Sequence, residues 1–114
     1  MYKENNDFDK RFKESENIKK KYPTRIPVIV ERFKKCKNIE EIDKNKYLVP
    51  DDLTLGQFIF VIRKRLKLTP DKAIFLFVNN KMVPSHTLMK KVYENEKEED
   101  NFLYMCYSGE NTFG

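Results

Sequence analysis

Apolar residues recur at helical spacing near the start of the chain, within a strongly charged segment that covers residues 7–23. The positions that share one face of this segment are Phe8, Phe12, Ser15, Ile18 and Tyr22. The thin stripe predicts an amphipathic helix, with Asp7 as its N-cap and Pro23 as its end. Residues 2–6, which precede it, could form one more helical turn or stay loose.

Two stretches with the composition of strands follow. Residues 25–33 are rich in β-branched side chains and predict a strand. Pro27 within it favours either a sheet edge or a position whose N–H the sheet does not need. The polar residues 35–45 predict a connection, and residues 46–50 predict a short strand that Pro50 closes. A hairpin is therefore expected.

Residues 53–68 give the clearest helical pattern. Thr54 and Gln57 have the spacing of a capping box, and Leu53 with Phe58 has that of a hydrophobic staple. One face collects the side chains expected to enter the core, which are Leu55, Phe58, Ile59, Ile62 and Leu66. The cationic residues near the C-terminal end suit the dipole of such a helix.

Two short, continuous apolar runs complete the pattern. Residues 73–78 predict a strand buried on both faces, and residues 102–107 predict a second central strand. A short helix between them is expected to begin at Ser85 or Thr87 and to end at about Glu96. The order of elements predicts an α+β fold with the ubiquitin-like β-grasp arrangement, in which a central helix crosses a four-stranded mixed sheet.

Composition sets limits on the class of protein. Hydrophobic residues make up 39% of the chain and charged residues 36%, which is enough for one core under a densely charged surface. No apolar run approaches the ~20 residues of a membrane span, and the charged N-terminus lacks the apolar stretch of a signal peptide. We therefore expect a cytoplasmic protein.

The net charge of +5 is uneven, because residues 1–65 carry 17 Lys and Arg against 11 Asp and Glu. This half of the chain favours acidic partners or an anionic membrane. Its basic clusters, residues 19–21 and 32–35, show no nucleic-acid motif.

Reactive side chains are few. The two cysteines, Cys36 and Cys106, are expected to be free thiols in a chain without a secretory signal. A nucleophilic pair of one cysteine with the single histidine, His86, is formally open. Cys106, however, falls in an apolar strand pattern typical of an inert core thiol, and the spacing fits no zinc motif. We expect no catalytic group, metal or cofactor.

Four stretches, taken together, resemble one family. They are residues 19–32 (KKKYPTRIPVIVER), 43–66 (DKNKYLVPDDLTLGQFIFVIRKRL), 73–80 (AIFLFVNN) and 98–108 (EEDNFLYMCYS), with Phe-Gly at 113–114. The chain resembles the autophagy ubiquitin-like modifiers of the GABARAP type. The resemblance implies an N-terminal extension of two helices over residues 1–24, a β-grasp core over residues 25–107 and a flexible tail over residues 108–114.

The residues alone leave two interpretations of Gly114 open, a truncated end or a reactive carboxylate. The resemblance implies that an E1-like enzyme activates this glycine with ATP and that an E2-like cysteine then receives the acyl group. The final acceptor would be the amine of phosphatidylethanolamine, and a cysteine protease would reverse the reaction. The product would be a membrane-tethered adaptor on the autophagosome and related vesicles.

The resemblance also implies that the strand over residues 46–50 docks short peptides. An edge strand can accept a partner peptide as a further strand, and the family binds an aromatic residue followed, three positions on, by an aliphatic one. The residues implied for the aromatic pocket are Glu14, Ile18, Pro27, Lys46, Leu48 and Phe102. Those implied for the aliphatic pocket are Tyr47, Val49, Pro50, Leu53, Phe58 and Val61. Acidic residues beside the peptide motif would meet Arg25, Lys46 and Arg63.

Two other functions stay open. The first is a non-conjugated peptide-binding or cytoskeletal adaptor that uses the same edge strand and the basic N-terminal helix, with acidic tubulin tails as candidate partners. The second is an enzyme that uses Cys36 or Cys106. Replacing Gly114 with alanine would separate the first from the conjugated modifier, and replacing both cysteines with serine would test the second.

Overall fold

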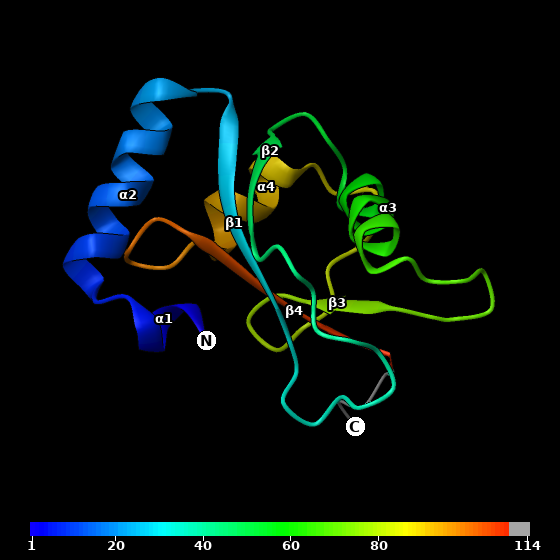
Figure 1. Ribbon diagram of the computed structural model, residues 1–114. Coiled ribbons are helices and arrows are strands. Elements are labelled where there is room, and N and C mark those ends of the chain that lie inside the picture. Colours follow the sequence, from blue (N-terminus) through cyan, green and yellow to red (C-terminus); the bar gives the residue numbers. More distant parts are fainter. Residues whose placement is uncertain (110–114) are drawn as a thin grey trace.

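Figure 1 shows the computed structural model of the protein, which describes residues 1–109. The helices are α1 (Tyr2–Asn5), α2 (Phe8–Lys21), α3 (Leu55–Leu66) and α4 (Met89–Glu96). The strands are β1 (Arg25–Arg32), β2 (Lys46–Pro50), β3 (Phe75–Phe77) and β4 (Leu103–Ser108).

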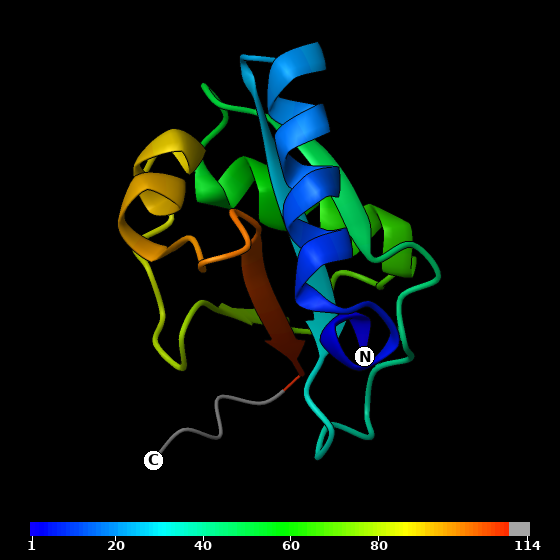
Figure 2. The same cartoon turned by 90° about the vertical axis from the view of Figure 1, so that its left-hand side faces the viewer.

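The four strands form one mixed sheet in the order β2-β1-β4-β3. β1 is antiparallel to β2 and parallel to β4, and β3 is antiparallel to β4. The sheet separates α1 and α2 on one face from α3 and α4 on the other (Figures 1 and 2). This arrangement confirms the predicted α+β, β-grasp fold.

β1 is buried on both faces and joins two cores. Val28 and Val30 belong to the main core, which α3 and α4 cover, whereas Ile29 points to the opposite face. There it packs with Tyr2 of α1 and with Phe102. The second, smaller core therefore attaches the N-terminal helices to the sheet by burial of apolar surface.

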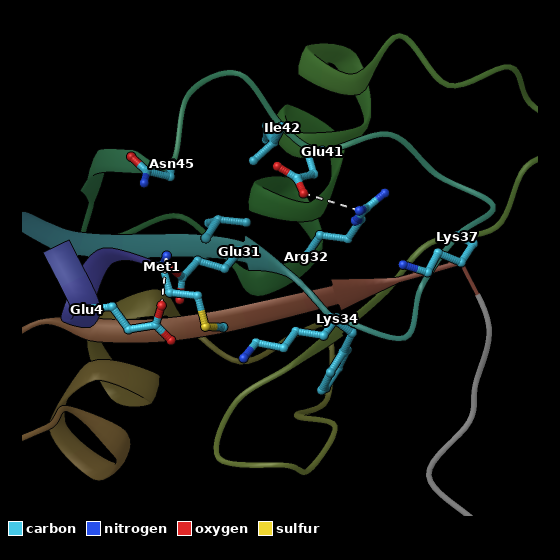
Figure 3. Close-up of a pocket in the computed structure, with 11 residues that line it drawn as sticks. Met1, Glu4, Glu31, Arg32, Lys34, Lys37, Glu41, Ile42 and Asn45 are labelled. Atoms are coloured by element: carbon cyan, nitrogen blue, oxygen red, sulfur yellow. Dashed lines mark hydrogen bonds and ion pairs between the residues drawn. The ribbon is translucent and has the colours of Figure 1, made fainter.

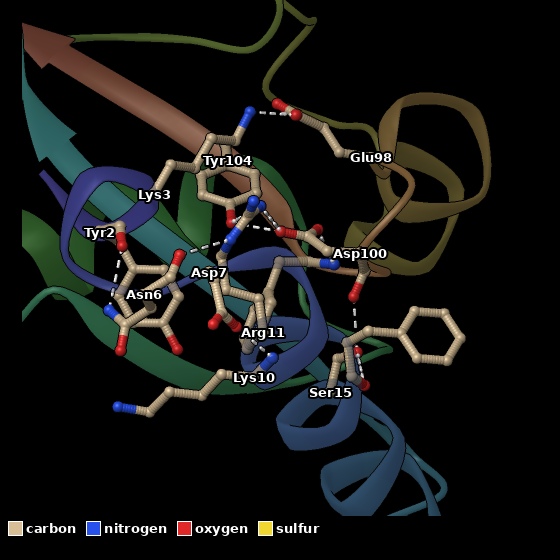
Figure 4. A network of polar contacts seen from close by, with 12 residues as sticks. Tyr2, Lys3, Asn6, Asp7, Lys10, Arg11, Ser15, Glu98, Asp100 and Tyr104 are labelled. Carbon is tan, nitrogen blue, oxygen red and sulfur yellow. Dashed lines mark hydrogen bonds and ion pairs between the residues drawn. The ribbon is translucent and has the colours of Figure 1, made fainter.

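A polar network also holds α2 against the loop before β4 (Figure 4). The carboxylate of Asp100 is 1% exposed and accepts from the Arg11 guanidinium and the Tyr104 hydroxyl, each at 2.5 Å. Its second oxygen accepts the backbone N–H of Phe102 at 2.9 Å, and Ser15 donates to the Asp100 carbonyl at 2.6 Å. The buried acid is thus fully paired.

The segment that leads from β2 into α3 agrees with the sequence prediction. β2 begins at Lys46, ends at Pro50 and lies at the sheet edge. The Thr54 side chain accepts the N–H of Gln57 at 3.2 Å, and the Gln57 side chain accepts the N–H of Thr54 at 2.9 Å. This reciprocal capping box satisfies two backbone donors, so α3 starts at a defined residue directly after the edge strand.

Pro27 does not mark a sheet edge, because β1 lies between β2 and β4. The backbone N–H of Val30 donates to the Asn45 carbonyl at 2.7 Å. Hydrogen-bonded and non-bonded positions alternate along an antiparallel pair, so Pro27 occupies a non-bonded position opposite Leu48. Pairing with β4 starts only at Val28. The second alternative from the sequence, a position whose N–H is not needed, is therefore the correct one.

Two predicted elements were wrong in detail. Residues 73–78 were expected to form a strand buried on both faces, but β3 covers only Phe75–Phe77 and is the second edge of the sheet. The helix expected from Ser85 or Thr87 begins at Met89. The carbonyls of Ser85 and Thr87 accept the N–H groups of Gly56 and Leu55, at 2.9 and 2.8 Å. This extended pairing with the first turn of α3 excludes an earlier helix start.

The end of β4 lies further along the chain than expected. Ser108 was assigned to the tail, but it is the last residue of β4, pairs with Phe75 and is 3% exposed. Its place in the sheet explains its burial. Residues 110–114, and with them the role expected of Gly114, lie outside the described residues.

Candidate functional site

β2 exposes one edge of the sheet, because within residues 1–109 β1 alone pairs with it. The hydrogen bond from the Val30 N–H to the Asn45 carbonyl fixes which residues of β2 direct their backbone N–H and C=O groups toward β1. Counted from that bond, Lys46 and Leu48 occupy non-bonded positions and direct their N–H and C=O groups away from β1. Those groups form a free edge, meaning one that no further strand covers, and it can accept one more strand. The Leu48 carbonyl on this edge accepts a hydrogen bond from the Arg25 side chain.

A cavity of about 770 Å³ opens beside this edge, between α2 and β2. It is lined by Lys10, Lys13, Glu14, Asn17, Ile18, Lys21, Tyr22, Arg25, Lys44, Lys46 and Leu48. Six of these residues are cationic and one, Glu14, is acidic. Ile18 and Leu48 supply apolar surface. A cavity with an apolar part and a cationic rim suits an aromatic side chain carried by an acidic peptide.

Glu14 is held by partners from two other elements. Lys46 of β2 donates to its Oε2 atom, and the hydroxyl of Tyr2 in α1 donates to its Oε1 atom. Burial alone would raise the pKa of Glu14, but these two hydrogen bonds outweigh burial and leave the pKa lowered. The pKa of Tyr2 is raised, first by burial and then by its bond to Glu14. Glu14 is therefore a carboxylate at neutral pH.

Of the six residues predicted for the aromatic pocket, four line this cavity, namely Glu14, Ile18, Lys46 and Leu48. The other two lie beneath the surface. Pro27 is buried opposite Leu48, and Phe102 is fully buried in the small core that Ile18 covers. They can support the cavity wall, whereas the first four can contact a ligand.

The residues predicted for the aliphatic pocket are less accessible. Tyr47, Val49 and Phe58 are at most 7% exposed and belong to the main core. The rings of Tyr47 and Phe58 pack edge-on, with centroids 5.6 Å apart. Pro50 and Leu53 are half-buried, and Val61 is exposed. An aliphatic side chain can therefore contact only the last three without displacing core side chains.

All three of the predicted charge contacts already bind the chain itself, and Lys46 does so through Glu14. Arg25 donates to the Leu48 carbonyl at 3.1 Å, on the free edge of β2. Arg63 donates to the backbone carbonyls of Lys72 and Thr69, at 2.6 and 3.0 Å. Arg63 therefore closes the loop after α3, while Arg25 and Lys46 remain on the cavity rim.

Several residues that line the cavity were not predicted from the sequence. They are Lys10, Lys13, Asn17, Lys21, Tyr22 and Lys44. Helical spacing from Glu14 would have found three of them, because Lys10, Asn17 and Lys21 lie on the same face of a helix. Lys44 precedes the edge strand and carries no comparable signal.

Figure 3 shows a second cavity, of about 550 Å³, between α1, the end of β1 and the loop that follows. Some of its charges are paired within the chain. Arg32 lies 3.2 Å from Glu41, and the N-terminal amine of Met1 lies 3.7 Å from Glu4. Its lining also holds three acidic residues, Glu4, Glu31 and Glu41, so it offers less net positive charge to an acidic peptide than the cavity between α2 and β2.

The cysteines lie in different surroundings. Burial alone would raise the pKa of the Cys36 thiol, but backbone hydrogen bonds from Gly109 and Ile39 lower it. Burial raises the pKa of Cys106 to about 11. Among the described residues, no hydrogen bond joins either thiol to the exposed His86. The described part of the chain thus does not assemble a cysteine–histidine pair.

The chain is similar to proteins of a known family. The model of the family described as autophagy protein Atg8 ubiquitin like matches residues 10–114. Autophagy-related protein 8e of Arabidopsis thaliana is 59% identical over 114 residues, which is 100% of this chain and 93% of that protein. Autophagy-related protein 8 of Schizosaccharomyces pombe is 57% identical, again over 100% of this chain and 93% of its own length. The chain therefore belongs to the Atg8 family of ubiquitin-like autophagy proteins.

Proposed function

We propose that this protein is a ubiquitin-like modifier that is joined through Gly114 to phosphatidylethanolamine and acts as a membrane-tethered adaptor in autophagy. In this role it recruits receptors that carry an aromatic residue and, three positions on, an aliphatic one. It contributes no catalytic group. The observation that carries the docking role is the cationic cavity beside the free edge of β2.

The bound peptide adds to the sheet as a strand beside β2. Its backbone pairs with the outward N–H and C=O groups of Lys46 and Leu48, which gives affinity that does not depend on peptide sequence. An aromatic side chain enters the cavity between Ile18 and Leu48. Alternate side chains of the bound peptide strand face the same side, so acidic residues near the motif can face the lysines of the cavity rim. The attraction between these opposite charges increases the association rate.

The conjugation role follows the chemistry of the family. The Gly114 carboxylate attacks ATP to form an acyl adenylate and pyrophosphate, and a thiol of the E1-like enzyme displaces AMP. After transfer to the E2-like cysteine, the lipid amine attacks the thioester carbonyl, and the leaving thiolate takes up the released proton. Glycine suits this passage because it has no Cβ and can enter narrow clefts.

The lipid provides the attachment to the membrane. None of the helices in residues 1–109 is both long and apolar enough to cross a bilayer. One acyl chain anchors a protein only marginally, at about 0.8 kcal/mol per buried CH₂, whereas two anchor it stably. Phosphatidylethanolamine has two acyl chains, so conjugation to it is sufficient to anchor the protein stably to the membrane. A cysteine protease of the pathway would release the protein again.

The docking role is tested by placing a charge in the cavity. Leu48→Asp should weaken the binding of an aromatic-x-x-aliphatic peptide by at least about tenfold, because the new carboxylate must lose water beside the bound ring. Isothermal titration calorimetry measures the effect. Phe60→Asp is the matched control, since Phe60 is 57% exposed on α3. Equal affinity of Leu48→Asp and wild type would refute docking at this cavity.

A further inference from the structure

Both carboxylate oxygens of Glu14 have partners within the chain, and one partner comes from outside the cavity. Lys46, a lining residue, donates to Oε2, whereas Tyr2 of α1 donates to Oε1. Tyr2 is 8% exposed, and its ring packs edge-on against Phe102 with centroids 5.6 Å apart. Its backbone N–H donates to Glu31 of β1 at 2.8 Å. The phenol is therefore fixed by contacts that do not involve Glu14.

Lys46 has two competing partners. In the free protein its ammonium bonds to Glu14 and lies 5.2 Å from the centroid of the Tyr2 ring. The proposed docking role requires the same ammonium to meet an acidic residue of the peptide. Glu14 is only partly exposed, and a carboxylate in such a position is destabilised when its cation leaves, unless another donor remains.

We propose that Tyr2 is a positioning residue for this exchange. Its hydroxyl keeps the Glu14 carboxylate hydrogen-bonded while Lys46 turns to an acidic residue of the peptide. Each carboxylate oxygen can accept more than one hydrogen bond, so Tyr2 does not have to move when Lys46 does. The proposal rests on the docking function above and extends it, because it makes α1 a determinant of the preference for acidic peptides.

The test compares two synthetic peptides with the same aromatic-x-x-aliphatic motif. One has three Asp residues before the motif and the other has three Asn residues. At pH 7 we expect wild type to prefer the Asp peptide, and Tyr2→Phe to reduce the ratio of the two affinities by roughly three- to tenfold. Tyr104→Phe is the matched control, since it removes a hydroxyl bonded to Asp100 in the same small core. It should leave the ratio unchanged.

The pH dependence separates this role from a loss of packing. The charged groups facing Glu14 are Lys46 of β2 and Lys10 of α2, and the titratable but neutral hydroxyl of Tyr2 also faces it; Asp100 and Arg11 act on Tyr2. Near pH 5 Glu14 gains a proton if its pKa rises. In Tyr2→Phe with Lys46 on the peptide, both hydrogen bonds that lowered the pKa of Glu14 are lost, so burial raises that pKa against the charge of Lys10 alone. The proton on Glu14 then takes the place of the lost Tyr2 hydroxyl. The loss of preference for the Asp peptide in Tyr2→Phe should therefore be smaller at pH 5 than at pH 7.

A second variant tests the same exchange from the other side. Glu14→Gln removes the carboxylate that competes for Lys46, so it should keep at least the wild-type preference for the Asp peptide. Adding Tyr2→Phe to Glu14→Gln should then change nothing. A lower preference in Glu14→Gln, or a further loss in the double variant, would contradict the exchange.

The outcomes distinguish the two proposals. Failure of wild type to bind either peptide would reject the docking function itself. Binding without a preference for the Asp peptide, or a preference that Tyr2→Phe leaves intact, would reject the role of Tyr2 and leave docking standing. A defect that is the same at pH 5 and pH 7, or that Tyr104→Phe shares, would also reject it.

Discussion

Replacing Asp100 with alanine should lower the free energy of unfolding by about 3 kcal/mol, a large share of the stability of a domain of this size. The carboxylate is 1% exposed and pairs with Arg11 and with the Tyr104 hydroxyl. Its removal leaves these donors, and the N–H of Phe102, without their acceptor where little water can reach them. Guanidinium unfolding followed by circular dichroism measures the loss.

Two further variants make the Asp100 result specific. Asp100→Asn keeps one acceptor oxygen and the shape of the side chain, so its loss should be smaller. Glu99→Ala changes the exposed neighbour and should have little effect. Hydrogen exchange of the α2 amides should rise in Asp100→Ala, because the network connects α2 to the loop before β4 (Figure 4). A loss below about 1 kcal/mol would show that the network does not hold α2 in place.

Replacing Gly114 with alanine should abolish formation of the phosphatidylethanolamine conjugate. The expected reason is that a Cβ hinders entry of the acyl group into the clefts of the conjugating enzymes. A reaction with the E1-like and E2-like enzymes, ATP and vesicles containing phosphatidylethanolamine tests this by intact mass. Wild type should gain the mass of the lipid less one water, and Gly114→Ala should stay unmodified.

Peptide binding provides the control for Gly114→Ala. The substitution lies beyond the last residue of β4, Ser108, and should leave docking at β2 unchanged. If the wild-type protein binds the peptide but forms no lipid conjugate, the alternative of a non-conjugated adaptor is favoured. The candidate partners of such an adaptor include acidic tubulin tails. A lipid adduct on Gly114→Ala would contradict the assignment of the acyl donor.

The parts of the fold that the sequence predicted well are those with local signals. The capping box of Thr54 and Gln57 involves residues three apart, and the structure confirms both of its hydrogen bonds. The strand at residues 46–50 is bounded by Pro50 and has the same ends in the structure. Such features depend on neighbours along the chain, which a sequence pattern contains.

The wrong predictions concern contacts between distant segments. The segment before α4 is extended because it pairs with the first turn of α3, and no local pattern of residues 85–88 reveals that partner. β3 is an edge strand because of the strand order, although its composition is that of a buried strand. Residues 2–6 were expected either to form one more helical turn or to stay loose, and neither alternative indicated that Tyr2 contacts Glu14 and lies beneath Lys46. These contacts arise only when the sheet assembles α1, α2 and β2 together.

Docking at the free edge of β2 is the central proposal, and one measurement tests it directly. Amide chemical shifts of the ¹⁵N-labelled protein are recorded while an aromatic-x-x-aliphatic peptide is added. The largest changes should fall on Lys46 and Leu48, whose N–H groups face outward, and on the α2 residues that line the cavity. Changes centred instead on β3, the opposite edge, with β2 unaffected, would contradict the proposed site.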